Sequence, residues 1–376
     1  MPLLPLLAIN AIAMMAAALG LAGLGSWPPQ AAAHVAFALG ILPLILAAMA
    51  YFIPVLTRSG SGAPPWLHAV PLGAWLGGVC MVAGFTGYLG FAGTSHAAFL
   101  LAGAAAVAML AWTWRRGQRA VGKPHPGLNW YLAALACLVL ALLAVPLMSV
   151  WPAQHAALRL FHLHLNLLGF VGLTALGTLQ VLVPTAAGRP DARAAQRLAG
   201  DLKFAFSGVL LLALGAAWLK PLALLGAALY LVAPLRMALH WRHDYADLIC
   251  RRHGATSSLA LACAGLLGLL VLGIGHALGL LAGRDAIGAF VLAFLLPLVS
   301  GAATQLLPVW LRPGPQREWH AQVRTALGWL AGVRALLMVA GGLCLALGWT
   351  QGLWLALAGL ALLVLGTLRG LSMKLR

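Results

Sequence analysis

Residues 161–184 read FHLHLNLLGFVGLTALGTLQVLVP, an apolar run that nevertheless begins with two histidines. At about 1.5 Å of rise per residue, a helix of this length crosses the hydrocarbon core of a bilayer. Imidazoles are costly to bury there, so we expect His162 and His164 to have partners that offset the cost. The stretch therefore predicts both a transmembrane helix and a functional site within it.

The rest of the chain has the same apolar character. The 376 residues are 63% hydrophobic and only 8% charged, which is too apolar for a soluble domain. Long apolar runs between short polar loops predict an all-α polytopic membrane protein, with residues 1–376 forming a single membrane domain. The first residues, MPLLPLLAIN, lack a basic segment, so we expect a retained first span rather than a cleaved signal. We predict twelve transmembrane helices, over residues 3–24, 33–56, 67–92, 95–114, 130–151, 158–184, 203–218, 221–241, 255–280, 286–310, 324–347 and 352–368.

The net charge of +17 is distributed by loop. The positive-inside rule then predicts that both termini lie in the cytoplasm, in a bacterial-type inner membrane. This distribution favours a lipid bilayer as the partner and argues against nucleic acid. Nineteen of the 23 Lys and Arg residues fall in alternate loops or at the C-terminus: Arg58, Arg115, Arg116, Arg119, Lys123, Arg189, Arg193, Arg197, Lys203, Arg236, Arg242, Arg251, Arg252, Arg312, Arg317, Arg324, Arg369, Lys374 and Arg376.

Three predicted spans end alike, which indicates an internal repeat. His34 and His164 each precede an end proline by 20 residues, and Gly288 takes that place in the third copy. We predict three four-helix units, approximately 1–125, 126–245 and 246–376, related by rotation about the membrane normal. The alike ends are AYFIPVLTR around Pro54, QVLVPTAAGR around Pro184 and QLLPVWLR around Pro308.

Half of the histidines fall at or near the outer ends of predicted spans. His34 and His164 should lie at the same depth on equivalent helices. His162 and His164 are two residues apart, about 200° around a helix, so they point into different compartments. A single histidine on an apolar helix usually just bonds a carbonyl, but this shared depth favours metal ligation. The candidate metal ligands are His34, His96, His155, His162, His164 and His276.

The chemistry of these residues suits haem. Two neutral imidazoles from different helices can hold one haem iron. The five cysteines contain no CxxC or CxxCH, so neither a zinc ribbon nor a covalent c-type haem is expected, and the predicted cofactor is a non-covalent b-type haem. Arg159 and Arg334 are the candidate partners of its propionates. Copper is an alternative occupant of a second site, formed by His162 with some of His96, His155 and His276.

The segment HLHLNLLGFVGLTALGTLQVLVP resembles the HxH helix of haem-copper oxidase subunit I, above all in the cbb-type branch. The matching residues are His162, His164, Gly169, Phe170, Gly177 and Pro184. The resemblance implies twelve helices in three pseudo-equivalent four-helix arcs. It also implies that His164 and His34 hold a low-spin haem, while His162 corresponds to the ligand of the reactive haem.

Some features of that family are missing. The HxH pair lies on the sixth predicted span instead of the tenth, and the adjacent histidine pair that helps bind copper is absent. Oxygen reduction coupled to proton pumping is therefore not expected. Residues 173–190, LTALGTLQVLVPTAAGRP, also resemble the NnrS-like membrane proteins, which are linked to the nitric oxide response and to haem and copper.

The expected function is a haem-binding membrane protein in electron transfer or in nitric oxide or oxygen binding and response. Respiratory-chain subunits or quinol are its expected partners, and any catalytic activity would be that of an oxidoreductase. Two alternatives belong to other classes. Parallel repeats and 44 glycines suit a copper or small-solute transporter. An assembly factor of a respiratory complex would keep the histidines only as remnants.

Overall fold

The computed structural model describes the chain apart from residues 1–2, 24, 26, 60, 282–285 and 375–376. The described residues form helices and no strands. Twelve helical segments are long and apolar enough to cross a membrane, which confirms the prediction of a polytopic α-helical membrane protein. These segments are Leu3–Gly23, Pro29–Leu56, Pro65–Phe85, Phe91–Gln118, Gly127–Val150, Pro152–Ala186, Ala194–Trp218, Lys220–Asp244, Ala255–Ala277, Ala286–Leu311, Arg317–Ala346 and Gly352–Gly370.

The chain divides into two compact units, which are described separately. Unit 1 comprises Met1–Ala8, Leu179–Asp191 and Pro234–Arg376, and unit 2 comprises Ile9–Thr178 and Ala192–Ala233. Three helices have residues in both units: α1 (Leu3–Gly23), α8 (Leu173–Ala186) and α10 (Lys220–Asp244).

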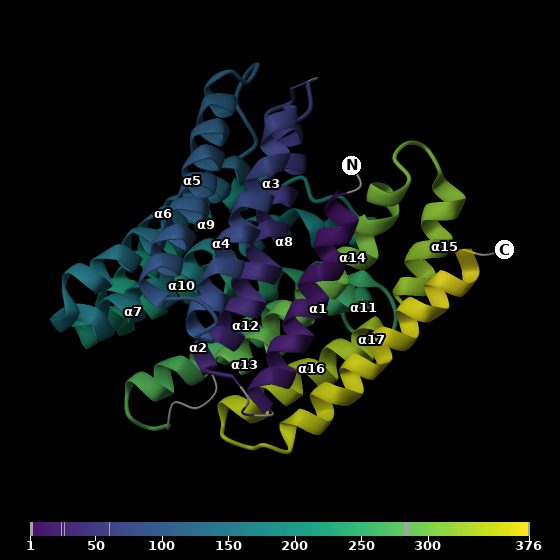
Figure 1. Cartoon of the computed structure of the whole chain (residues 1–376). Coiled ribbons are helices and arrows are strands. Elements are labelled where there is room, and N and C mark those ends of the chain that lie inside the picture. The colour runs from purple at the N-terminus through teal and green to yellow at the C-terminus, as the bar shows by residue number, and fades with distance from the viewer. Residues whose placement is uncertain (1–2, 24, 26, 60, 282–285, 375–376) are drawn as a thin grey trace. The chain divides into compact units, whose positions relative to one another are not determined.

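Unit 2 contains most of the candidate histidines. Its α4 and α5 run side by side (Figure 1), and α6 packs against α5, α7 and η4. Helix α7 also packs against α9. Besides its parts of α1, α8 and α10, unit 2 consists of α2 (Pro29–His34), η1 (Val35–Ile41), α3 (Leu42–Leu56), η2 (Pro65–His68), α4 (Ala69–Phe85), α5 (Phe91–Gln118), α6 (Gly127–Val150), η3 (Pro152–Gln154), α7 (His155–His164), η4 (Leu165–Gly172) and α9 (Ala194–Trp218).

Unit 1 is centred on α16, which packs against α12 and α17. The α16–α17 pair forms the yellow-green and yellow hairpin of Figure 1. Besides its parts of α1, α8 and α10, unit 1 consists of α11 (Ala246–Ile249), α12 (Ala255–Ala277), α13 (Ala286–Phe290), η5 (Val291–Leu295), α14 (Leu296–Leu311), α15 (Arg317–Leu327), α16 (Ala331–Ala346) and α17 (Gly352–Lys374).

Two predicted boundaries were wrong for backbone reasons. The third span was expected to reach residue 92 but ends at Phe85, because Gly87 adopts a φ of +76° that stops a right-handed helix. The eleventh span was expected to begin at residue 324. It begins at Arg317 and is broken before α16, where Leu330 has a φ of +48°. In both places hydropathy continues across the break, so the pattern alone did not reveal it.

Three helices contain a π-helical stretch, in which the turn is wider than in an α-helix. Segment η1 begins directly after His34, and η4 begins directly after His164. With η5 in the tenth span, each π stretch leads into the helix that contains one of the three end prolines. π segments are rare and often occur at functional sites. They add a likeness among the three spans, although the threefold repeat and its boundaries remain a prediction.

Side chains from other helices support two of these π stretches. Pro43 has no N–H, so the carbonyl of Leu39 in η1 loses its α-helical donor. The Asn10 side-chain amide donates to that carbonyl at 2.7 Å. In η4, the Tyr230 hydroxyl donates to the Leu168 carbonyl at 2.9 Å. Hydrocarbon offers no water to such groups, so a tertiary partner stabilises the wider turn.

Helices α9 and α10 are joined by a single residue, Leu219, and their backbones touch at glycines. A Cβ on Gly226 would lie 2.2 Å from the Leu212 backbone nitrogen and 2.7 Å from the Gly208 carbonyl oxygen. Only small residues permit such contact between membrane helices. By contrast, nothing lies within 4 Å of a Cβ built on Gly200, which is also in α9.

These two glycines predict opposite stability effects for the same substitution. Gly226→Ala should lower the free energy of unfolding by about 1–3 kcal/mol, because the added methyl meets backbone. Gly200→Ala should raise it by about 0.5–1 kcal/mol, because alanine loses less conformational freedom in a helix. Thermal unfolding in detergent measures both. Equal effects of the two substitutions would contradict the close approach of α9 and α10.

Candidate functional site

His34 is the last residue of α2, directly before η1. Its ring nitrogen Nδ1 lies 2.7 Å from the Gln30 carbonyl oxygen, one turn earlier. The ring also packs against Phe85, with centroids 5.0 Å apart. The imidazole is half-buried, so one carbonyl and one aromatic ring set its orientation while part of its surface remains accessible.

His162 and His164, both on α7, bond in different directions. The Nδ1 atom of His162 lies 2.8 Å from the carbonyl oxygen of Ala141 on the neighbouring helix α6. The Nδ1 atom of His164 lies 2.8 Å from the carbonyl oxygen of Leu160 on its own helix. This divergence agrees with the angle of about 200° expected for residues two apart on a helix.

The bonding partners determine which ring nitrogen carries the proton. A carbonyl oxygen only accepts hydrogen bonds, so Nδ1 must be the protonated nitrogen of His34, His162 and His164. In these neutral rings, Nε2 therefore keeps its lone pair. Within the described residues, no hydrogen bond engages Nε2 of these three rings. A histidine that binds a metal commonly has this arrangement, with the other nitrogen bonded to a carbonyl.

The structure brings His34 close to His162. The two imidazoles, from α2 and α7 of unit 2, are near enough for their charges to interact. The expected pairing of His34 with His164 stays a prediction.

The remaining candidate histidines are exposed. His96 repeats the local bond, with Nδ1 2.5 Å from the Ala92 carbonyl oxygen, but it lies near the exposed start of α5. His155 begins α7, and His276 lies at the end of α12 in unit 1. No group of three or more His, Cys, Asp or Glu side chains suited to a metal ion occurs among the described residues. A second metal site formed by His162 with some of His96, His155 and His276 stays a prediction.

The two candidate arginines differ in their surroundings. Arg159 is exposed on α7, three residues before His162 and so on the same helical face. Arg334 is 1% exposed, and its Nη2 donates to the Thr304 hydroxyl of α14 at 3.3 Å. Arg159 therefore lies on the face of His162, and the role of Arg334 as a propionate partner stays a prediction.

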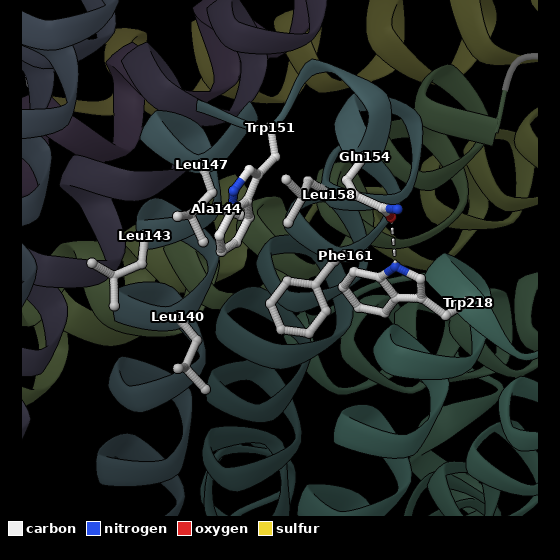
Figure 2. A pocket seen from close by; sticks show the side chains of 9 residues that line it. All are labelled: Leu140, Leu143, Ala144, Leu147, Trp151, Gln154, Leu158, Phe161 and Trp218. Carbon is white, nitrogen blue, oxygen red and sulfur yellow. Dashed lines mark hydrogen bonds between the residues drawn. The ribbon is translucent and has the colours of Figure 1, made fainter. Parts of the chain in front are cut away.

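A groove lies on the adjoining faces of α6, α7 and α9 (Figure 2). It has a volume of about 430 Å³, and its walls are mainly leucine and aromatic side chains. The rings of Phe161 and Trp218 are 5.8 Å apart, and the Trp218 indole donates to the Gln154 side-chain oxygen at 2.9 Å. Phe161 directly precedes His162. The groove could hold a flat, apolar molecule against the Phe161 and Trp218 rings.

Ion pairs occupy the loop side of unit 1. His240 lies 3.1 Å from Asp191 and 3.2 Å from Asp244. Arg189 makes two hydrogen bonds to Asp247, at 2.8 and 2.7 Å, which hold the pKa of that carboxyl below its usual value. Acidic residues in these loops therefore neutralise part of the basic charge.

Sequence reasoning also missed two residues that support π stretches: Tyr230 at η4, after His164, and Asn10 at η1, after His34. Tyr230 is fully buried, and its hydroxyl packs against Gly172. A Cβ added to Gly172 would lie only 2.2 Å from the hydroxyl oxygen. Asn10 was equally unremarked, although a single amide in an apolar first span is itself a signal. Both residues act on the helices that present the histidines.

Comparisons with known proteins yield no relative: no protein-family model matches the chain, and no curated protein is significantly similar to it. Function is therefore inferred from the residues themselves.

The support from Tyr230 predicts a selective loss of stability. Tyr230→Phe removes the donor to the buried Leu168 carbonyl and should cost about 1–3 kcal/mol in the free energy of unfolding. Tyr88→Phe is the control, because Tyr88 is 79% exposed and should change stability little. Denaturant-induced unfolding in micelles measures the difference. If both variants unfold like the wild type, the Tyr230 bond does not support η4.

Proposed function

We propose that this chain is a membrane-embedded haem-binding protein that resembles haem-copper oxidase subunit I. Its role would be electron transfer, or the binding of nitric oxide or oxygen. One observation carries the proposal: His34 and His162, on different helices of unit 2, each bond a carbonyl through Nδ1 and so keep Nε2 available. An iron macrocycle takes such a lone pair on each of its two faces.

The number of ligands supports a macrocycle over a bare ion. A zinc or copper ion held by protein alone usually takes three or four side-chain ligands. A porphyrin supplies four nitrogen ligands to its iron, so the protein provides only one or two further ligands. The described residues contain no group of three ligands but do bring two imidazoles together. The proposed cofactor is therefore a non-covalent b-type haem, and copper is the weaker alternative.

The two faces of α7 suggest how the histidines divide their roles. We assign His34 and His162 as the axial pair, since they are neighbours. His164 points elsewhere and would be a single ligand on the other side of α7. Two axial imidazoles suit electron transfer, whereas a single imidazole leaves a position open for nitric oxide or oxygen. In each case the bond from Nδ1 to a carbonyl orients the ring.

The surroundings of the axial pair support two further assignments. The exposed guanidinium of Arg159, on the His162 face of α7, would pair with a propionate at the membrane edge. The groove beside Phe161 would admit a quinol, because aromatic walls and one amide suit a flat ring with polar ends. Respiratory-chain subunits are the other candidate partners, and any activity would be that of an oxidoreductase.

A spectrum tests the proposal directly. Protein produced with an ample haem supply should show a Soret band and sharpened visible bands on reduction. His34→Ala and His162→Ala should each lower the bound haem by about tenfold or more, since losing even an outer partner of a metal ligand weakens binding that much. The measurement is absorbance at the Soret maximum per mole of protein.

His96→Ala is the matched control for this experiment. His96 makes the same bond to a carbonyl one turn earlier but is exposed, so its loss should leave the haem content unchanged. His164→Ala distinguishes one haem from two, because it should remove only a second spectral component. The absence of a Soret band at every haem loading would overturn the proposal. Solute uptake by vesicles containing haem-free protein would then favour a transporter, and retained partner binding an assembly factor.

Membrane orientation is part of the proposal and has its own test. The alternation of basic loops supports cytoplasmic termini in a bacterial-type inner membrane. A fluorescent protein fused after Arg376 should therefore fluoresce in cells, and alkaline phosphatase fused there should be inactive. The same reporters fused at Tyr88, between α4 and α5, should give the opposite pattern. The reverse result at either position would contradict this orientation.

A further inference from the structure

Arg334 of unit 1 is a buried cation with poorly satisfied donors. Its Nη1 lies 3.5 Å from the Trp329 carbonyl oxygen, and its Nη2 lies 3.3 Å from the Thr304 hydroxyl, which are both long hydrogen bonds. Its Nε is buried and has no hydrogen-bond partner among the described residues. A guanidinium that is 1% exposed needs an anion to offset its desolvation.

The helices around Arg334 offer no carboxylate to fill this role. The sequences of α14, α16 and α17 contain neither Asp nor Glu. Glu318 is the single acidic residue of α15, and its side chain is exposed near the start of that helix. The missing counter-ion therefore has to come from outside these four helices.

Two further arginines converge on the same region. Arg324 Nε donates to the carbonyl of Gln305 at 3.3 Å. Gln305 directly follows Thr304, whose hydroxyl accepts from Arg334. The Arg369 guanidinium lies over the ring of Trp329 at 5.7 Å, and the carbonyl of this same residue accepts from Arg334. Three guanidinium groups thus lie in the region of the turn at residues 328–330, which we call the Trp329 turn.

A glycine keeps α17 close to this turn. A Cβ on Gly366 would lie 3.1 Å from Nη1 of Arg334, so a larger residue there would press on the guanidinium. The Trp329 turn itself includes Leu330, whose φ of +48° ends one helix and starts the next. The backbone therefore leaves room for the Arg334 guanidinium beside α17.

We infer that Arg334, together with Arg324 and Arg369, binds a phosphate group at the Trp329 turn of unit 1. Guanidinium groups match phosphate oxygens in geometry and number of donors. Basic pockets between transmembrane helices on the cytoplasmic side commonly bind phosphate-bearing lipid headgroups. The positive-inside pattern assigns the loop before α15 to that side. The phosphate would belong either to an anionic phospholipid or to a free phosphate ion.

Two binding measurements on the full-length protein in detergent test this inference and separate the two sources. Native mass spectrometry after adding cardiolipin or phosphatidylglycerol, with phosphatidylcholine for comparison, tests the lipid. Thermal unfolding with inorganic phosphate, against chloride at equal ionic strength, tests the free ion. Arg334→Gln should weaken binding of whichever ligand binds the wild type, anionic lipid or phosphate, by about tenfold or more, because a charged, buried donor is lost.

A matched pair of surface arginines keeps the test valid if Arg334→Gln fails to fold. Arg369 and Arg312 are both exposed, and each lies over a tryptophan ring, Trp329 and Trp319 respectively. Arg369→Gln should weaken binding severalfold, whereas Arg312→Gln should leave it unchanged. Equal binding by all variants, or equal response to phosphate and chloride with no preference for anionic lipid, would overturn the inference.

Discussion

Every backbone carbonyl that leaves the regular α-helical pattern inside a membrane needs a partner from the protein, since hydrocarbon supplies none. Two π stretches in unit 2 meet this requirement through other helices. Asn10 bonds the Leu39 carbonyl, and Tyr230 bonds the Leu168 carbonyl. These bonds hold the segments that directly follow His34 and His164. The placement of the candidate ligands thus depends on polar contacts far away in sequence.

The same requirement orients the imidazoles. In each of His34, His162 and His164, the Nδ1–H donates a hydrogen bond to a backbone carbonyl, which leaves Nε2 as the basic atom. For His34 and His164 the carbonyl is one turn earlier in the same helix. For His162 it is on α6, so α6 and α7 must be packed before that ring is oriented. A neutral ring with one nitrogen satisfied is inexpensive to bury and ready to bind.

Buried charge follows a different logic in unit 1. Arg334 has two long hydrogen bonds and no carboxylate, a state that costs free energy unless an anion is bound. The exposed loop pair of Arg189 and Asp247 needs no such help, because water already solvates both groups. An arginine in an apolar span was recognisable as unusual from sequence. Its depth, and the arginines near it, were not.

The sequence by itself determined that the chain crosses a membrane, because hydropathy and length depend on composition alone. It also indicated the histidines and the spacing to the end prolines, since these are counts along the chain. The tertiary structure decided where α4 ends, which spans contain π stretches, and which imidazoles meet. His162 is oriented by a carbonyl of α6, because helix rotation is set by packing against neighbours such as α6 and α9. Such contacts join residues far apart in sequence, and no local pattern records them.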